Sequence, residues 1–110
     1  MDAFELKELI VQQQASGRAY LEFLRVASLS VGVYSLPKGG VDPQKPHTED
    51  EVYMVVHGKA TIRVGDEDRP VEPGSVVFVA SNVEHRFHGI TEDLTVLVFF
   101  APAEYANAPK

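Results

Sequence analysis

The sequence predicts an all-β domain that begins with one short helix. After residue 17 the chain consists of short runs rich in β-branched and aromatic residues, which suit a pleated surface. Turn signals built on glycine, proline and acidic residues separate these runs at even intervals. A chain of 110 residues can bury one hydrophobic core but is too short for two such domains. Short, evenly spaced strands around one core imply a closed or two-sheet β architecture.

The helix is predicted over residues 3–16. Asp2 and Glu5 have the spacing of a capping pair, and Gly17 ends the run. We expect residues 1–17 to pack on the domain or on a partner subunit and to carry no chemistry. One face of this helix bears the side chains that would make the contact, Leu6, Leu9, Ile10 and Gln13.

Eight strands are predicted between residues 18 and 100, which would form the β-domain. Residues 37–46 cannot continue a ladder, because they include three prolines and two glycines, and they are predicted to form a constrained loop. Gly58 with Lys59 is predicted to close one hairpin, and residues 65–68 and 72–74 form further turns. The predicted strands are 20–26, 29–36, 51–57, 60–64, 69–71, 75–79, 85–88 and 94–100.

Some predicted strands are apolar on both faces, notably residues 52–56 and 96–100. An isolated domain with a wet exterior does not need this pattern, so we expect a homodimer that buries one sheet. Phe78 and Phe99 are predicted to lie in the core. Residues 101–110 are rich in alanine and proline and are predicted to form a loosely held C-terminal tail.

Composition excludes several classes of function. The net charge of -6 disfavours a nucleic-acid partner, since affinity for phosphate backbones comes largely from basic residues. No apolar run approaches the roughly 20 residues that span a bilayer, and the N-terminus does not resemble a signal peptide. We therefore expect a cytoplasmic protein without a membrane partner. The chain has no cysteine, so any metal must be held by nitrogen and oxygen ligands.

Two motifs carry the candidate chemistry. The first runs Gly39, five residues, Lys45, one residue, His47, three residues, Glu51, six residues, Gly58. The second runs Gly74, five residues, Ala80, one residue, Asn82, two residues, His85. Together they resemble the two motifs of the cupin superfamily, and the resemblance covers most of residues 28–100. Three positions depart from the family pattern: Lys45 replaces the first of two histidines, Ala80 a proline and Asn82 a glycine.

The resemblance implies a cupin-type double-stranded β-helix, a jelly-roll barrel of the RmlC-like kind. It also implies one divalent metal inside the barrel, held by His47, Glu51 and His85. On a straight strand His47 and Glu51 would lie about 13 Å apart, so the chain must turn between them. The intervening residues, Thr48, Glu49 and Asp50, suit such a turn. A metal-free polar pocket is the alternative interpretation of these three residues.

Two imidazoles and one carboxylate form the arrangement used by many non-haem Fe(II) enzymes, and Zn(II), Mn(II) or Ni(II) would fit almost as well. Lys45 cannot ligate a metal while it is protonated. The carbonyl oxygen of Gln44 is an alternative candidate for a weak fourth ligand. The acidic residues Glu49, Asp50 and those within 65–68 lack the spacing of a calcium loop and are predicted to be solvated.

The remaining candidates concern a substrate pocket. Strand parity places Tyr53 with Glu51, and Phe87 with His85, so both aromatic rings are candidates for contact with a small-molecule ligand, with core packing as the alternative. Lys45 is a further candidate for the pocket and a possible proton donor. His57 is predicted to be structural or at the surface, and His88 to point away from the interior.

The sequence leaves two classes of function open. The first is a metal-dependent enzyme that acts on a small molecule, either an Fe(II) dioxygenase or an isomerase. The second is a metal-assisted small-molecule binding module without turnover. A shared fold does not decide between them.

Overall fold

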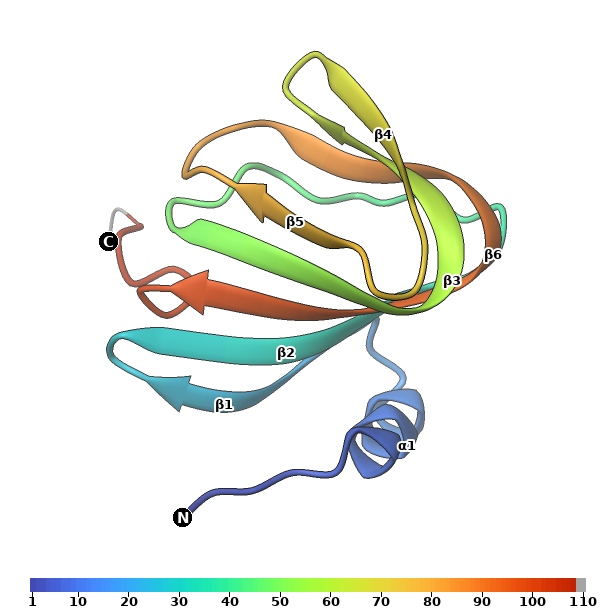
Figure 1. Cartoon of the computed structure of the whole chain (residues 1–110). Coiled ribbons are helices and arrows are strands. Elements are labelled where there is room, and N and C mark those ends of the chain that lie inside the picture. Colours follow the sequence, from blue (N-terminus) through green and yellow to red (C-terminus); the bar gives the residue numbers. More distant parts are fainter. Residues whose placement is uncertain (109–110) are drawn as a thin grey trace.

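The computed structural model describes residues 1–108 of the chain. It contains one helix and six strands, which form a single antiparallel sheet folded into a barrel (Figure 1). The all-β prediction with a short N-terminal helix is confirmed. The elements are α1 (Leu6–Ser16), β1 (Tyr20–Val26), β2 (Leu29–Leu36), β3 (Asp50–Val64), β4 (Glu67–Val71), β5 (Val76–Val79) and β6 (His85–Ala101).

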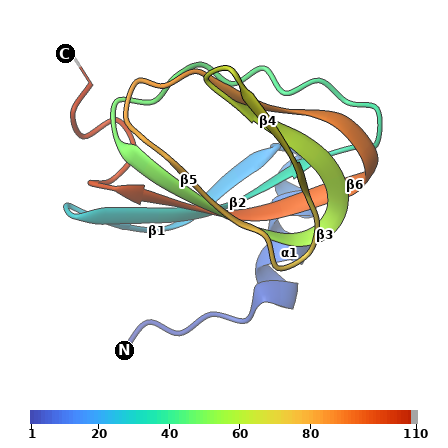
Figure 2. The same cartoon turned by 45° about the horizontal axis from the view of Figure 1, so that its top comes forward.

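The two long strands β3 and β6 pass through both layers of the barrel. The first half of β3 pairs with the end of β6, and its second half pairs with the start of β6. One layer therefore contains β1, β2, the second half of β6 and the first half of β3. β5 lies at the edge of this layer, paired with β3. The other layer contains β4 with the remaining halves of β3 and β6. Figure 2 shows the two layers facing each other, with α1 outside the barrel.

The sequence-based division of β3 and β6 into shorter strands is wrong. Gly58 does not close a hairpin but lies within β3, where the register with β6 shifts. Its φ of 92° suits glycine, and a Cβ atom there would lie 2.2 Å from the carbonyl oxygen of Asp93. The inward-facing positions change from Tyr53 and Val55 to Ala60 and Ile62 across this point. The bend thus carries one strand from the first layer into the second.

The helix ends as predicted, but it begins without the predicted cap. Gly17 adopts the left-handed conformation that closes the helix. Glu5 occupies the N-cap position and makes no side-chain capping bond, so the predicted capping pair does not form. Leu9 and Gln13 are the buried residues of α1, which packs against β1 and β2.

The core lies between the layers and is mainly aliphatic and aromatic. Tyr53, Phe87 and Phe100 are its largest fully buried side chains. Phe99 was predicted to belong to the core, but it is half-buried and lies outside the core cluster. Phe78 was also predicted to belong to the core, but it is 60% exposed. It lies opposite Val52 on the neighbouring strand, on the outer side of the sheet, because Glu51 and Tyr53 occupy the inward positions.

Residues 101–108 are not the loose tail that their composition indicated. Ala103 is buried, and the backbone of the following residues forms hydrogen bonds with side chains of the barrel. This segment lies beside the start of β3 (Figures 1 and 2). Residues 109–110 of the predicted tail lie outside the described residues.

Among the described residues, no helix combines the length and apolar character needed to cross a membrane.

Candidate metal centre

Three ligand-type side chains meet inside the barrel near one end. His47 ends the long loop after β2, Glu51 is the second residue of β3, and His85 is the first residue of β6. The chain bends at residues 48–49 between the first two, as the spacing predicted. Each of the three residues offers a ligand atom within 4.8 Å of the others. They therefore form a buried group that could hold a metal ion.

The distances within this group suit one shared ion. Oε1 of Glu51 lies 2.9 Å from Nε2 of His85 and 3.5 Å from Nδ1 of His47. Two atoms bound to one metal at about 2.0–2.2 Å lie about 2.8–3.6 Å apart in tetrahedral or octahedral coordination. The carboxylate oxygen can thus share a metal with both imidazoles without a large movement of any of the three side chains.

The polar atoms that face one another in this group lack conventional hydrogen bonds among the described residues. They are Nδ1 of His47, Nε2 of His85 and both carboxylate oxygens of Glu51. Buried polar atoms are normally satisfied, so these facing donor and acceptor atoms fit the binding of a shared cation. The other ring nitrogen of His85, Nδ1, lies 2.9 Å from the carbonyl oxygen of Val83. That contact leaves the Nε2 lone pair free for a metal.

The electrostatics of the group are dominated by Glu51. Burial raises the pKa of Glu51, but the imidazoles of His47 and His85 beside its carboxylate outweigh burial and the pKa is lowered. Burial lowers the pKa of His47, whereas the carboxylates of Glu104 and Glu51 raise it, and the net result is a pKa of about 9. The pKa of His85 is also raised, because the bond to Glu51 outweighs burial. Without a metal, the buried carboxylate is thus compensated by protonated histidine.

The backbone of Asn82 joins the segments that carry His47 and His85. Asn82 has a φ of 64°, in the left-handed region where asparagine is tolerated, and this explains how it can occupy a position at which the family pattern has glycine. Its backbone N–H donates to the carbonyl oxygen of His47 at 2.7 Å. The segment before His85 is therefore bonded directly to the segment that carries His47.

A buried carboxylate organises the loop before His47. Asp42 accepts hydrogen bonds from the hydroxyl of Tyr34 at 2.7 Å and from the backbone N–H of Phe87 at 2.9 Å. It also accepts from the side-chain amide of Gln44 at 2.7 Å. Sequence reasoning missed this residue. A single acid between Val41 and Pro43, in a loop that must be rigid, was the only available signal.

Gln44 is held between two residues of the interior. Its carbonyl oxygen accepts a hydrogen bond from the hydroxyl of Tyr53 at 2.8 Å, and its amide donates to Asp42. Burial raises the pKa of Tyr53 well above its ordinary value, so the hydroxyl keeps its proton. That Gln44 is a fourth metal ligand stays a prediction. In that case its carbonyl oxygen would bind the metal and also accept the hydrogen bond from Tyr53.

The two aromatic candidates pack against each other beside His47, Glu51 and His85, which we name the metal group. Tyr53 and Phe87 are 0% and 1% exposed, with their ring centroids 4.9 Å apart in an edge-to-face arrangement. The ring of Tyr53 also lies 6.0 Å from that of His85. Neither residue lines the pockets that adjoin His47 and His85, and their contact with a substrate stays a prediction.

The larger pocket has a volume of about 630 Å³ and reaches the metal group at His47. Its walls include the aromatic residues Tyr20, Tyr34 and Phe100, and Lys45 and Glu104 supply charged groups. The hydroxyl of Tyr20 is buried without a hydrogen-bond partner among the described residues. Sequence reasoning did not single out Tyr20, Tyr34 or Phe100, because their shared surface exists only after the barrel closes.

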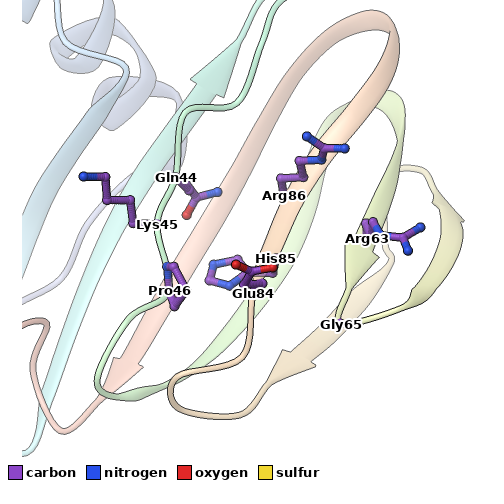
Figure 3. A pocket seen from close by; sticks show the side chains of 8 residues that line it. All are labelled: Gln44, Lys45, Pro46, Arg63, Gly65, Glu84, His85 and Arg86. Atoms are coloured by element: carbon purple, nitrogen blue, oxygen red, sulfur yellow. The ribbon is translucent and has the colours of Figure 1, made fainter.

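A second pocket of about 410 Å³ shares Gln44, Lys45 and Pro46 with the first and is also lined by His85. Figure 3 shows Lys45 on one side of His85 and Arg63 on the other, with the lysine ammonium group pointing away from His85. Lys45 borders both pockets, and its contact with a substrate stays a prediction.

The other two histidines lie apart from this group. His57 is exposed, and His88 is half-exposed with Nε2 2.8 Å from a carboxylate oxygen of Asp68. Both positions agree with their predicted separation from the interior. Glu49, in contrast, was predicted to be solvated but is only 1% exposed, because the C-terminal segment covers it.

The chain is similar to known proteins in sequence and in fold. A family model described as the cupin domain matches residues 32–100. A protein of uncharacterised function from Streptomyces coelicolor, SCO3923, is 54% identical over 104 residues, which are 94% of this chain and 99% of that protein.

Solved structures show the same fold. The structure of TT1209 from Thermus thermophilus superposes with a TM-score of 0.72 at 24% identity, covering 94% of this chain and 99% of that one. An Rmlc-like cupin family protein from Methanocaldococcus jannaschii, with a double-stranded β-helix fold, gives a TM-score of 0.69 at 20% identity. That match covers 76% of this chain and 78% of the other. At these identities the likeness establishes the fold alone.

Proposed function

Because this chain belongs to the cupin domain family, we propose that it is a mononuclear metal-dependent enzyme that acts on a small molecule. In this proposal His47, Glu51 and His85 hold one divalent metal. An Fe(II) oxygenase of the dioxygenase type is the reaction class that the two-histidine, one-carboxylate set supports best. A cytoplasmic location stays a prediction from the sequence.

The observation that carries the proposal is the cluster of unsatisfied buried atoms. Three different segments of the chain deliver His47, Glu51 and His85 to one point, where their facing atoms have no conventional hydrogen-bond partners among residues 1–108. A buried polar atom without a hydrogen bond costs roughly 1–3 kcal/mol, and in the metal-free protein protonation of the histidines would have to offset that cost. A divalent cation would satisfy all three side chains at once.

The adjoining pocket supports a small-molecule substrate. It is about 630 Å³ in volume, within the range of pockets that hold small ligands, and it reaches the metal group through His47. Aromatic walls would hold an apolar part of the substrate, while the hydroxyl of Tyr20 would donate to a polar part. When bound, the metal would supply Lewis acidity and open coordination positions.

Oxygen consumption by the iron-loaded protein tests this function. The metal-free protein would be loaded with Fe(II) under anaerobic conditions, mixed with small polar and aromatic compounds, and monitored with an oxygen electrode. We expect uptake that depends on both the metal and one class of compound. His57→Ala, which changes an exposed histidine, should behave as the wild type, whereas Glu51→Ala should show no uptake above background.

A second outcome would identify a different class of function. If a compound raises the melting temperature of the metal-loaded protein but is recovered chemically unchanged, the protein is a metal-assisted binding module. A site that takes up Zn(II) alone and is inert to oxygen would contradict the oxygenase proposal.

A further inference from the structure

The C-terminal segment of residues 102–107, which we name the strap, lies against the metal group. It falls outside the region matched by the family model, which ends at residue 100. The strap is fixed to the barrel at its start, where the backbone N–H of Glu104 donates to the hydroxyl of Ser30 at 2.8 Å. The guanidinium group of Arg25 donates to the carbonyl oxygen of Glu104, also at 2.8 Å.

Glu49 fixes the second half of the strap. Its carboxylate accepts hydrogen bonds from the backbone N–H groups of Tyr105 at 2.7 Å and Asn107 at 3.0 Å. Glu49 is 1% exposed and has no Lys, Arg or His partner in an ion pair among the described residues. Burial of a carboxylate is costly unless hydrogen bonds compensate it, so these bonds join the strap closely to the turn between His47 and Glu51.

This attachment places the carboxylate of Glu104 beside a candidate metal ligand. Oε2 of Glu104 lies 3.2 Å from Nε2 of His47, while Nδ1 of the same ring lies 3.5 Å from Oε1 of Glu51. The two ring nitrogens of His47 therefore face different carboxylates. Nδ1 is the nitrogen that lies toward Oε1 of Glu51, the carboxylate oxygen that His85 also contacts.

We propose that Glu104 is a positioning residue, which keeps a proton on Nε2 of His47 and directs Nδ1 of that ring to the metal. This inference rests on the proposed metal site. His85 has the opposite arrangement, because its Nδ1 lies 2.9 Å from the carbonyl oxygen of Val83 and its Nε2 faces Glu51. The two histidines would thus bind one metal through different ring nitrogens.

The opposite orientation of the His47 ring would sacrifice one of these contacts. A ring turned so that Nε2 faced Glu51 would no longer direct that nitrogen toward Glu104, and the 3.2 Å contact between the imidazole and the carboxylate would be lost. Hydrogen bonds to the second nitrogen of a ligand histidine fix both its tautomer and its direction. The strap would thereby complete the site from outside the two motifs.

Nitrogen NMR of the zinc-loaded protein tests the arrangement without any variant. Zn(II) is diamagnetic, so long-range 1H–15N correlation spectra can assign the metal-bound and protonated nitrogens of each ring. We expect His47 to bind through Nδ1 and keep a proton on Nε2, and His85 to bind through Nε2. Binding of His47 through Nε2 would overturn the inference.

Variants of Glu104 test its contribution to metal binding. Zn(II) affinity would be measured by competition with a chromophoric chelator, and melting temperatures of the metal-free variants would check the fold. We expect Glu104→Ala to weaken binding about 10–100-fold and to lose the single His47 tautomer. Glu104→Gln keeps an oxygen acceptor for Nε2–H and should retain most of the affinity. Glu67→Ala, which removes an exposed carboxylate of β4, should match the wild type.

The outcomes separate this inference from the metal site itself. If the wild type and Glu104→Ala bind Zn(II) equally well, Glu104 is not a positioning residue, although the metal site stands. If Glu104→Gln loses as much affinity as Glu104→Ala, the charge of Glu104 matters rather than its hydrogen bond, and the inference is wrong. If the wild type binds no Zn(II), both proposals are overturned.

Discussion

The carboxylate of Glu51 faces a ring nitrogen of each histidine of the candidate site. Its side chain is 0% exposed, and a buried carboxylate without compensation costs several kcal/mol. The carboxylate therefore requires a cation, either a metal ion or a protonated imidazole. In the metal-free protein His47 contributes to that charge, since neighbouring carboxylates raise its pKa to about 9, and Glu51 raises the pKa of His85 as well. Protons and metal consequently compete for Nδ1 of His47.

This competition predicts how the metal-free protein responds to pH. The pKa of His47 is higher in the folded state, about 9, than the ordinary value of 6.5 expected after unfolding. Its contribution to the free energy of unfolding is thus complete below pH 6.5 and is lost as the pH rises through about 9. Urea denaturation in the presence of EDTA should show this loss, while the affinity for Zn(II) should increase over the same range.

Substitution of single histidines provides the control for the pH effect. His47→Gln should remove most of the pH dependence between neutral and alkaline conditions, whereas the exposed His57→Gln should leave it unchanged. A wild-type free energy of unfolding that stays constant or increases over this interval would contradict the assignment of the charge to His47.

Residues that belong to a local spacing or to one of the two motifs could be predicted, whereas residues outside the motifs with distant partners could not. The spacing from His47 to Glu51 is local, and the second motif supplies His85. Asp42 bonds to the backbone of Phe87, 45 positions away, and Glu49 bonds to Tyr105, 56 positions away. Such contacts depend on closure of the barrel, so nothing in the surrounding residues indicates them.

At the level of elements, the bend in β3 decides how the barrel closes. β1 and β2 have the predicted bounds, because local turns mark their ends. Gly58 marks a bend instead, since its close neighbour is the carbonyl oxygen of Asp93 in β6. A sequence pattern can show that glycine is required at a position, but it does not show whether the chain reverses or bends there.

The close approach at Gly58 predicts the effect of adding one methyl group. Gly58→Ala combines an unfavourable positive φ with a contact of 2.2 Å to backbone, and should lower the free energy of unfolding by about 2–4 kcal/mol. Gly74 is the matched control, because its φ is 94° and no atom lies within 4 Å of the added Cβ. Chemical denaturation of both variants would measure the difference.

Equal destabilisation by the two substitutions would show that only the backbone conformation matters and that β6 does not constrain β3 at this point. A markedly larger loss for Gly58→Ala would support the bend as the element that joins the two layers.

At the scale of the whole molecule, one outer surface of the barrel exposes apolar side chains to solvent. Val76 and Phe78 of β5 are 65% and 60% exposed, and they pair with Met54 and Val52 of β3. Across β3 the same face continues to Leu97 and Phe99 of β6, which are half-buried. We name this surface the outer apolar face; it consists of Val52, Met54, Val76, Phe78, Leu97 and Phe99. The homodimer predicted from the sequence, in which one sheet is buried, would cover this face.

A charge at the centre of this surface should prevent association. Analytical ultracentrifugation of the wild type is expected to give the mass of a dimer, and Phe78→Glu that of a folded monomer, because a buried unpaired carboxylate opposes the contact. Val41→Glu, which alters an exposed apolar residue in the loop before β3, should remain dimeric. A monomeric wild type, or a dimeric Phe78→Glu, would contradict this interface.

Elemental analysis of the untagged protein tests the central claim most directly. The account predicts one divalent metal per chain in the wild type, with the metal retained in His57→Ala and His88→Ala. It predicts loss of that metal in His47→Ala, Glu51→Ala and His85→Ala, provided that circular dichroism shows each variant to be folded. Full occupancy in any of these three variants would remove that residue from the ligand set, and a wild type without affinity for divalent metals would contradict the account.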